Sequence, residues 1–144
     1  MVGSLHEDRT KIAIPTPVLA EVLTRAERAG ADYFTKLNRS AAFLIVPFET
    51  RAAIELARMN AAAILGGDKR GGLSASWAKI KFDRQIVAIA KVAAVKTVYS
   101  DDRDLRALAE AHAIKVISIQ ELPLPVEDMQ MTFAWNVHDE DEDE

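Results

Sequence analysis

The chain of 144 residues contains no cysteine, and only 6% of its residues are aromatic. The absence of cysteine excludes disulfide bonds and thiolate metal sites, and it permits an intracellular setting. No stretch is long and apolar enough to cross a membrane, and the N-terminus lacks the apolar segment of a signal peptide. We therefore expect a cytoplasmic protein without membrane contacts. The length predicts one domain with a substantial core.

Excess charge of one sign is confined to the C-terminus. Residues 139–144 are six of the 22 acidic residues, so the rest of the chain carries 16 acidic against 18 basic side chains. Such a body, with small basic clusters but no strong basic stripe, can still bind nucleic acid. We predict one domain over residues 1–126 and a tail over 127–144 whose acidic end is disordered. An alternative role for this end is to cover a basic groove.

Strand and helix patterns alternate along the domain. Strand-like runs, rich in β-branched residues, alternate with segments whose apolar residues recur at helical spacing. The predicted strands are residues 11–14, 42–46, 96–99 and 115–119, and the predicted helices are 17–29, 32–38, 50–65, 77–94 and 103–112. Thr16 is a plausible N-cap of the first helix, and Gly30 marks its end. This alternation predicts a three-layer α/β/α sandwich with a central parallel sheet.

Carboxylates gather where the third predicted strand meets its helix. The sequence KTVYSDDRDL places Asp101, Asp102 and Asp104 at this junction, directly after Ser100. In open parallel sheets, ligand sites lie beyond the carboxyl ends of the strands. Carboxylates crowded there repel one another unless a cation or a proton lies between them. The competing interpretation is an N-cap aspartate followed by solvated acids that suit the helix dipole.

Two further acids occur in matching contexts. Glu21 lies in the opening turns of the first helix, where a solvated acid is the default interpretation. Asp83 lies three residues after Ile80 and one helical turn before Val87, on or beside an apolar stripe. A carboxylate in that position is costly unless it is paired or bound to a metal. Arg84 is a poor local partner because neighbouring residues in a helix do not face each other.

The segments IPTPVLAE, KFDRQIVAIA and YSDDRDL, in this order, resemble those of the PIN-domain nucleases, especially the VapC-type ribonuclease toxins. The resemblance covers roughly residues 11 to 125. It implies that Glu21, Asp83 and Asp102 are the second, third and fourth acids of the catalytic quartet and ligands of the metal. By the same resemblance, Asp104 is an auxiliary metal ligand, and Ser100 is the small hydroxyl residue that orients the pocket.

The N-terminal segment departs from the family pattern. Family members open with a strand that ends in a first aspartate, roughly thirty residues ahead of the Ile-Pro-Thr segment. Here only residues 1–10 precede that segment, and they contain Glu7 and Asp8 without a strand-like run before them. A start placed too far downstream, a shortened chain, and a divergent member completed by a partner chain are the three explanations. Loss of that strand is expected to leave unpaired strand edges and exposed apolar surface.

The resemblance implies a metal-dependent endoribonuclease that hydrolyses RNA phosphodiester bonds with Mg²⁺ or Mn²⁺. Both ions prefer carboxylate and water oxygens, and such a site can activate water for in-line attack. An antitoxin protein and a second copy of the chain are further partners implied by the resemblance. The alternative is a catalytically impaired PIN-like module that binds RNA or a protein. An unrelated phospho-receiver module fits the order of the acids poorly.

Overall fold

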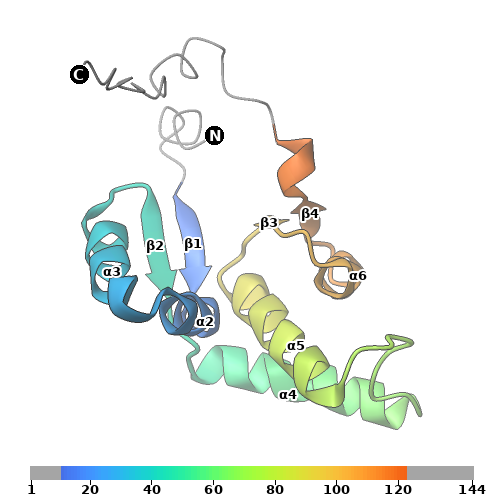
Figure 1. The fold of residues 1–144 in the computed structure, drawn as a ribbon. Helices are drawn as coiled ribbons and strands as arrows, with labels where there is room; N and C mark the ends of the chain where they lie inside the picture. Colours follow the sequence, from blue (N-terminus) through green and yellow to red (C-terminus); the bar gives the residue numbers. More distant parts are fainter. Residues whose placement is uncertain (1–10, 123–144) are drawn as a thin grey trace, which may run out of the picture.

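The computed structural model describes residues 11–122, apart from the side chain of Ile119. Figure 1 shows a mostly helical α/β arrangement that confirms the predicted alternation of strands and helices. The strands are β1 (Ile12–Pro15), β2 (Phe43–Val46), β3 (Thr97–Tyr99) and β4 (Lys115–Ile117). The helices are α2 (Thr16–Ala26), α3 (Gly30–Arg39), α4 (Thr50–Leu65), α5 (Trp77–Val92) and α6 (Arg103–Ala111), with short 3₁₀ helices η1 (Glu27–Ala29) and η2 (Ile119–Glu121).

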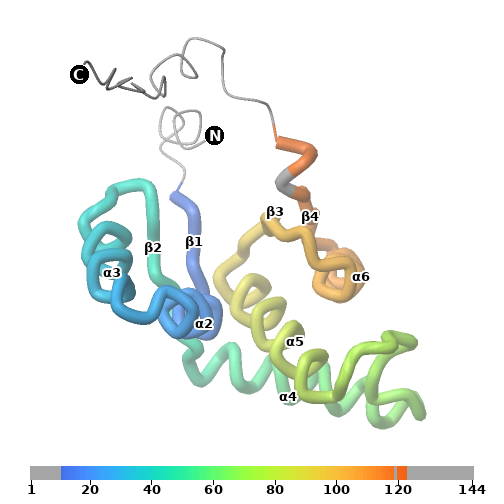
Figure 2. Tube along the Cα trace, viewed as in Figure 1, coloured from blue at the N-terminus to red at the C-terminus, as the bar shows by residue number. Residues whose placement is uncertain are grey.

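The strands form two separate parallel pairs. Strand β1 pairs with β2 from Ile12 opposite Phe43 to Pro15 opposite Val46, and β3 pairs with β4. Within residues 11–122 no hydrogen-bonded strand joins the two pairs, so the predicted single central sheet is not found there. Figure 2 shows both pairs on the same side of α4 and α5. The part of the prediction that holds is an α/β protein with parallel strand pairing.

Helix α5 organises the core. The Ser76 hydroxyl caps its first turn by accepting a hydrogen bond from the Lys79 backbone N–H at 3.2 Å. Apolar residues then occupy nearly its whole circumference, so the helix is buried between α4 and α6. The largest cluster of buried side chains contains Met59, Ile86, Val87, Ala88, Ala90, Leu105, Ala109, Ile114 and Val116. No helix in the described range is long and apolar enough to span a membrane.

Two local predictions near α2 were wrong. Pro15 holds the N-cap position of α2, and the Thr16 hydroxyl instead accepts a hydrogen bond from the backbone N–H of Phe48 at 3.1 Å. Gly30 caps the short η1 but does not end α2, and its own helical backbone angles begin α3. The break occurs at Glu27, whose φ of 48° lies in the left-handed region that a helix cannot continue through.

Several predictions lie outside the described residues. Glu7 and Asp8, the domain end at residue 126 and the tail over residues 127–144 belong to this part of the chain.

Candidate functional site

Three aspartates converge on the ammonium group of Lys79. Its Nζ lies 2.7 Å from Asp83 Oδ2, 2.8 Å from Asp102 Oδ2 and 3.7 Å from Asp104 Oδ2. Asp83 comes from α5, whereas Asp102 and Asp104 come from the start of α6, just after β3. When all four groups are ionised, three carboxylates and one ammonium leave a local charge of −2. The site is therefore negative and already holds one cation.

Asp83 is the buried member of this group. The residue is 4% exposed, and its hydrogen bond from Lys79 is a contact between residues four apart on one helix face. Burial raises the pKa of the Asp83 carboxyl, and the hydrogen bond from Lys79 opposes this shift without cancelling it. The nearby charges of Asp102 and Asp104 raise this pKa further. The sequence left Asp83 either paired or bound to a metal, and in the structure it is paired with Lys79 at the edge of the core.

The two carboxylate oxygens of Asp102 have different roles. Oδ1 caps α6 by accepting hydrogen bonds from the backbone N–H groups of Asp104 at 2.8 Å and Leu105 at 3.1 Å. Oδ2 contacts the Lys79 ammonium. Ser100 supports this geometry, because its hydroxyl accepts a hydrogen bond from the Asp102 backbone N–H at 3.1 Å. The N-cap interpretation is therefore correct, and it leaves one oxygen directed at a cation.

The environment drives the pKa values of Asp83 and Asp102 in opposite directions. Partial burial alone would raise the pKa of Asp102, but hydrogen bonds from Lys79 and from the α6 backbone outweigh it and hold that pKa below its usual value. Burial opposes the charged form of Lys79 as well, yet its hydrogen bonds to Asp102 and Asp83 raise its pKa, so it remains an ammonium. Of the two aspartates, Asp83 is therefore the stronger base.

Glu21 does not join the three aspartates. It is exposed on α2, and among residues 11–122 it makes no ion pair. It lines the same cleft as Lys79 and Asp102, a space of about 1010 Å³ between β1 and β3. The structure thus brings together Asp83, Asp102 and Asp104, and places Glu21 on another wall of the same cleft.

Lys79 is the residue that the sequence analysis missed. Its spacing to Asp83 is four residues, with the lysine on the N-terminal side, and this spacing alone could have identified the pair. Arg84, by contrast, is 3% exposed and does not contribute to a basic surface. Its guanidinium donates hydrogen bonds to the Lys69 carbonyl oxygen at 2.7 Å and to Asn60 Oδ1 at 3.3 Å, and so anchors the loop before α5.

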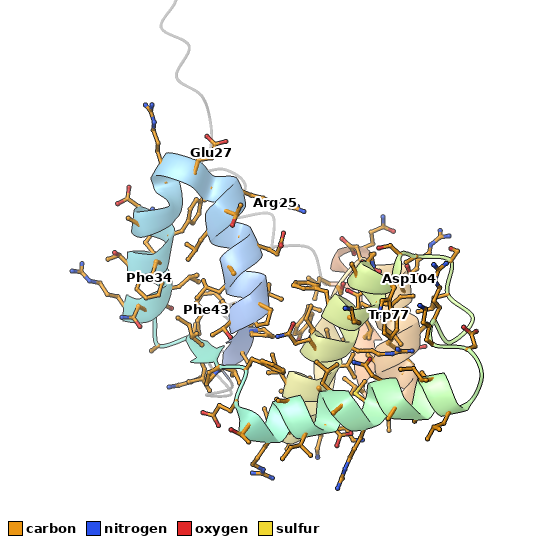
Figure 3. The ribbon with its side chains drawn as sticks, turned by 90° about the horizontal axis from the view of Figure 1, so that it is seen from below. Arg25, Glu27, Phe34, Phe43, Trp77 and Asp104 are labelled. Carbon is orange, nitrogen blue, oxygen red and sulfur yellow. The ribbon has the colours of Figure 1, made fainter. Side chains whose placement is uncertain are left out.

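A cluster of cations surrounds Trp77 at the start of α5. The Lys69 and Lys81 ammonium groups lie 5.2 and 5.6 Å from the centre of the indole ring, and the Arg84 guanidinium lies 5.7 Å from it. Figure 3 shows Trp77 and Asp104 at one end of α5, across the molecule from Phe34 and Phe43. Because residues two apart in a helix do not face each other, Trp77 and the lysines over its ring lie on a different face of α5 from Lys79 and Asp83.

Carboxylate oxygens have the right chemistry for Mg²⁺ or Mn²⁺. In residues 11–122, however, no three His, Cys, Asp or Glu side chains are placed so that they could hold a metal ion. The cation held by the aspartates is the ammonium of Lys79. Comparisons with protein families, with curated proteins and with solved structures gave no match.

Proposed function

We propose that this protein is a metal-dependent endoribonuclease of the PIN type, with Asp83, Asp102, Asp104 and Glu21 as its acidic residues. The observation that supports this most is the excess of carboxylate over ammonium around Lys79. Three carboxylates with one ammonium leave a net negative charge that attracts a further cation, and their side chains would have to rearrange to hold a metal ion together. Mg²⁺ or Mn²⁺, when bound there, would supply charge neutralisation and activation of water.

The opposite pKa shifts suggest a division of roles among the aspartates. Asp102 stays ionised and would hold the cation through Oδ2, while Oδ1 keeps it fixed to α6. Asp83, the stronger base, would take the proton of the attacking water. As the water oxygen bonds to phosphorus, the bond to the leaving ribose oxygen breaks, and that oxygen takes a proton from solvent.

The surroundings of Trp77 favour RNA as the substrate. Single-stranded RNA is bound by aromatic rings that stack on bases and by cations that contact phosphates. Trp77, Lys69 and Lys81 combine both features at the start of α5, on a different face of that helix from Lys79. The proposed substrate is therefore an unpaired RNA segment that would bind at Trp77 and continue round the start of α5 to the aspartates.

The test is cleavage of a panel of structured RNAs by the purified chain in Mn²⁺, with EDTA as the metal-free control. We expect cleavage that needs the metal and is lost in Asp83→Asn. Asp32→Asn is the matched control, because Asp32 is an exposed acid on α3 outside the site. Equal cleavage by Asp83→Asn and the unmodified chain would overturn the assignment.

A second candidate is a PIN-like module that binds RNA or a protein without cleaving RNA. The observation that favours it is the Lys79 ammonium at the centre of the aspartates, where it compensates their charge without metal. Direct titration with Mn²⁺ separates the two candidates. RNA binding at Trp77 without Mn²⁺ binding and without cleavage would support the module.

A further inference from the structure

The cleft between the two strand pairs is lined by both of their inner edges. Residues 11–15, which include all of β1, and residues 95–100, which include all of β3, line it. Its volume of about 1010 Å³ equals the upper end of the range for small-molecule sites. Within the described residues no segment pairs with both β1 and β3. The cleft is therefore bounded by two strands that each have a partner on the outer side.

The main chain of both edges is oriented for pairing. The Ile12 N–H donates to the Ala42 carbonyl, so the N–H and C=O groups of Ala13, the next residue, are turned away from β2. In β3, the Lys96 carbonyl accepts a hydrogen bond from Lys115 and the Ser100 N–H donates one to Ile117. The N–H and C=O groups of Thr97 and Tyr99, which alternate with these residues, are therefore turned away from β4. Edge groups of this kind form a template for another strand.

One face of the cleft is apolar. Phe82, Ile86 and Ile89 of α5 line it, together with Val22 of α2 and Tyr99 of β3. Val22 and Tyr99 are 42% and 38% exposed, which is high for large apolar side chains that face a cleft. A strand whose alternate residues are apolar would cover this face and leave its other residues toward solvent.

One segment outside the described residues has this pattern. In the sequence MQMTFAWNV, residues 129–137, the apolar side chains Met129, Met131, Phe133, Trp135 and Val137 occur at every second position. The residues between them are Gln130, Thr132, Ala134 and Asn136. This alternation over nine residues, in which Ala134 is the one apolar residue on the second face, predicts a β-strand with one buried face.

We propose that residues 129–137 insert between β1 and β3 as a strand, with their apolar face on α5. This strand would join the two pairs into one sheet of five strands. The proposal concerns the architecture of the chain and does not depend on the proposed ribonuclease activity.

The connection is long enough for this insertion. β4 is the direct neighbour of β3, roughly 5 Å from the strand that lines the cleft, and η2 follows β4 within two residues. Residues 123–128 can then span up to about 20 Å when extended. Charge is complementary as well, because residues 139–144 are all acidic and the exposed Lys11, Arg25 and Lys96 line the cleft.

The test is amide hydrogen exchange of the full chain, read by mass spectrometry for peptides covering residues 11–15, 96–100 and 129–137. We expect slow exchange in all three regions of the unmodified chain. Phe133→Asp places a charge on the apolar face and should speed exchange in all three by about tenfold or more. Thr132→Asp, the matched control on the opposite face, should leave the exchange unchanged.

Three results would overturn the proposal. Exchange of residues 129–137 at the rate of an unstructured peptide would show that they do not dock. Equal effects of Phe133→Asp and Thr132→Asp would show that the docking has no preferred face. Protection of β1 and β3 that rises with protein concentration would assign the cleft to a second copy of the chain. Circular dichroism of each variant checks that the helices remain folded.

Discussion

The N-terminal half of the described chain (β1, α2, α3 and β2) is packed far more loosely than the C-terminal half (α4, α5, β3, α6 and β4). Among residues 11–122, Leu19 and Ala42 are the buried apolar side chains of the N-terminal half and its connections. All members of the large core cluster belong to the C-terminal half and its connections. The difference lies in the buried core alone, because large exposed apolar side chains occur in both halves, such as Leu44 in β2 and Leu65 in α4.

The acidic residues divide in the same way. The three aspartates that converge on Lys79 are built on the well-packed C-terminal half, whereas Glu21 lies on the loosely packed half. Precise sites are held by elements whose side chains are fixed by packing. The position of Glu21 relative to the aspartates therefore depends on what fills the cleft between the halves.

The largest expected effect tests the packing difference directly. Ile80 is fully buried in α5, and Ile80→Ala should lower the free energy of unfolding by about 2 to 5 kcal/mol. Leu44 in the N-terminal half is 50% exposed, so Leu44→Ala should change it by about 0.5 kcal/mol or less. Urea unfolding of both variants measures the difference. A comparable loss for Leu44→Ala would show that β2 is covered by residues outside the described range.

The second prediction concerns the cation that joins α5 to α6. Lys79→Met removes the ammonium and leaves the three carboxylates facing one another. We expect a loss of about 1 to 3 kcal/mol at pH 7 without divalent metal, and a smaller loss at pH 3, where Asp83, the carboxyl with the raised pKa, is protonated. Urea unfolding at the two pH values measures it.

Lys81→Met is the matched control for Lys79→Met, since Lys81 is exposed over Trp77 and outside the carboxylate group. It should cost less than Lys79→Met and show little dependence on pH. If the ribonuclease proposal is correct, Mn²⁺ should also restore more stability to Lys79→Met than to Lys81→Met, because the metal would take the place of the ammonium. Equal losses in the two variants would contradict a special role for Lys79.

Local sequence patterns predicted the elements well because the signals for them are local. The helical period and its flanking residues placed α4 at residues 50–65, as observed, and α5 to within two residues of its end. The strand-to-helix junction after β3 predicted the cap and the cluster that includes Asp102 and Asp104. These features depend on neighbours a few positions apart, which the sequence displays directly.

The failures concern long-range contacts and competing partners. The Thr16 hydroxyl bonds the backbone of Phe48, 32 residues away, which no local cap pattern can indicate. The proposed joining of the two strand pairs would likewise depend on residues 129–137, which are far from β1 in the sequence. The contact between Lys79 and Asp83 was within reach of helical spacing, but those from Lys79 to Asp102 and Asp104 join residues more than 20 positions apart.

A third prediction separates the two oxygens of Asp102. Asp102→Ala removes both the cap of α6 and the contact with Lys79, and should cost about 1 kcal/mol or somewhat more. Asp102→Asn keeps an oxygen that can cap the helix, so it should recover most of that loss while removing the negative charge. Thermal unfolding of the pair measures the cap alone. Equal stability of the two variants would show that the cap contributes little to the C-terminal half.

The smallest expected effect is a gain in the free energy of unfolding, whereas the other substitutions are expected to lower it. Because burial raises the pKa of Asp83 above its ordinary value of 3.8, its charged form is less favourable in the folded chain than in the unfolded one. Protonated Asp83 therefore stabilises the folded chain, and this contribution is fully present below about pH 3.8. It is lost as the pH rises through the raised pKa of Asp83. Asp83→Asn should therefore be as stable as the unmodified chain, or more stable by up to about 1 kcal/mol, at pH 7.

The pH dependence of this difference is the measurement that decides the role of Asp83. The stability of Asp83→Asn relative to the unmodified chain should grow between pH 3 and pH 7, while that of the control Asp32→Asn changes little. A neutral or stabilising substitution that abolishes Mn²⁺ binding would mean that the C-terminal half retains a buried carboxylate for function. A loss of more than about 1 kcal/mol at pH 7 would instead mean that the bond from Lys79 outweighs burial, and that Asp83 serves mainly to join α5 to α6.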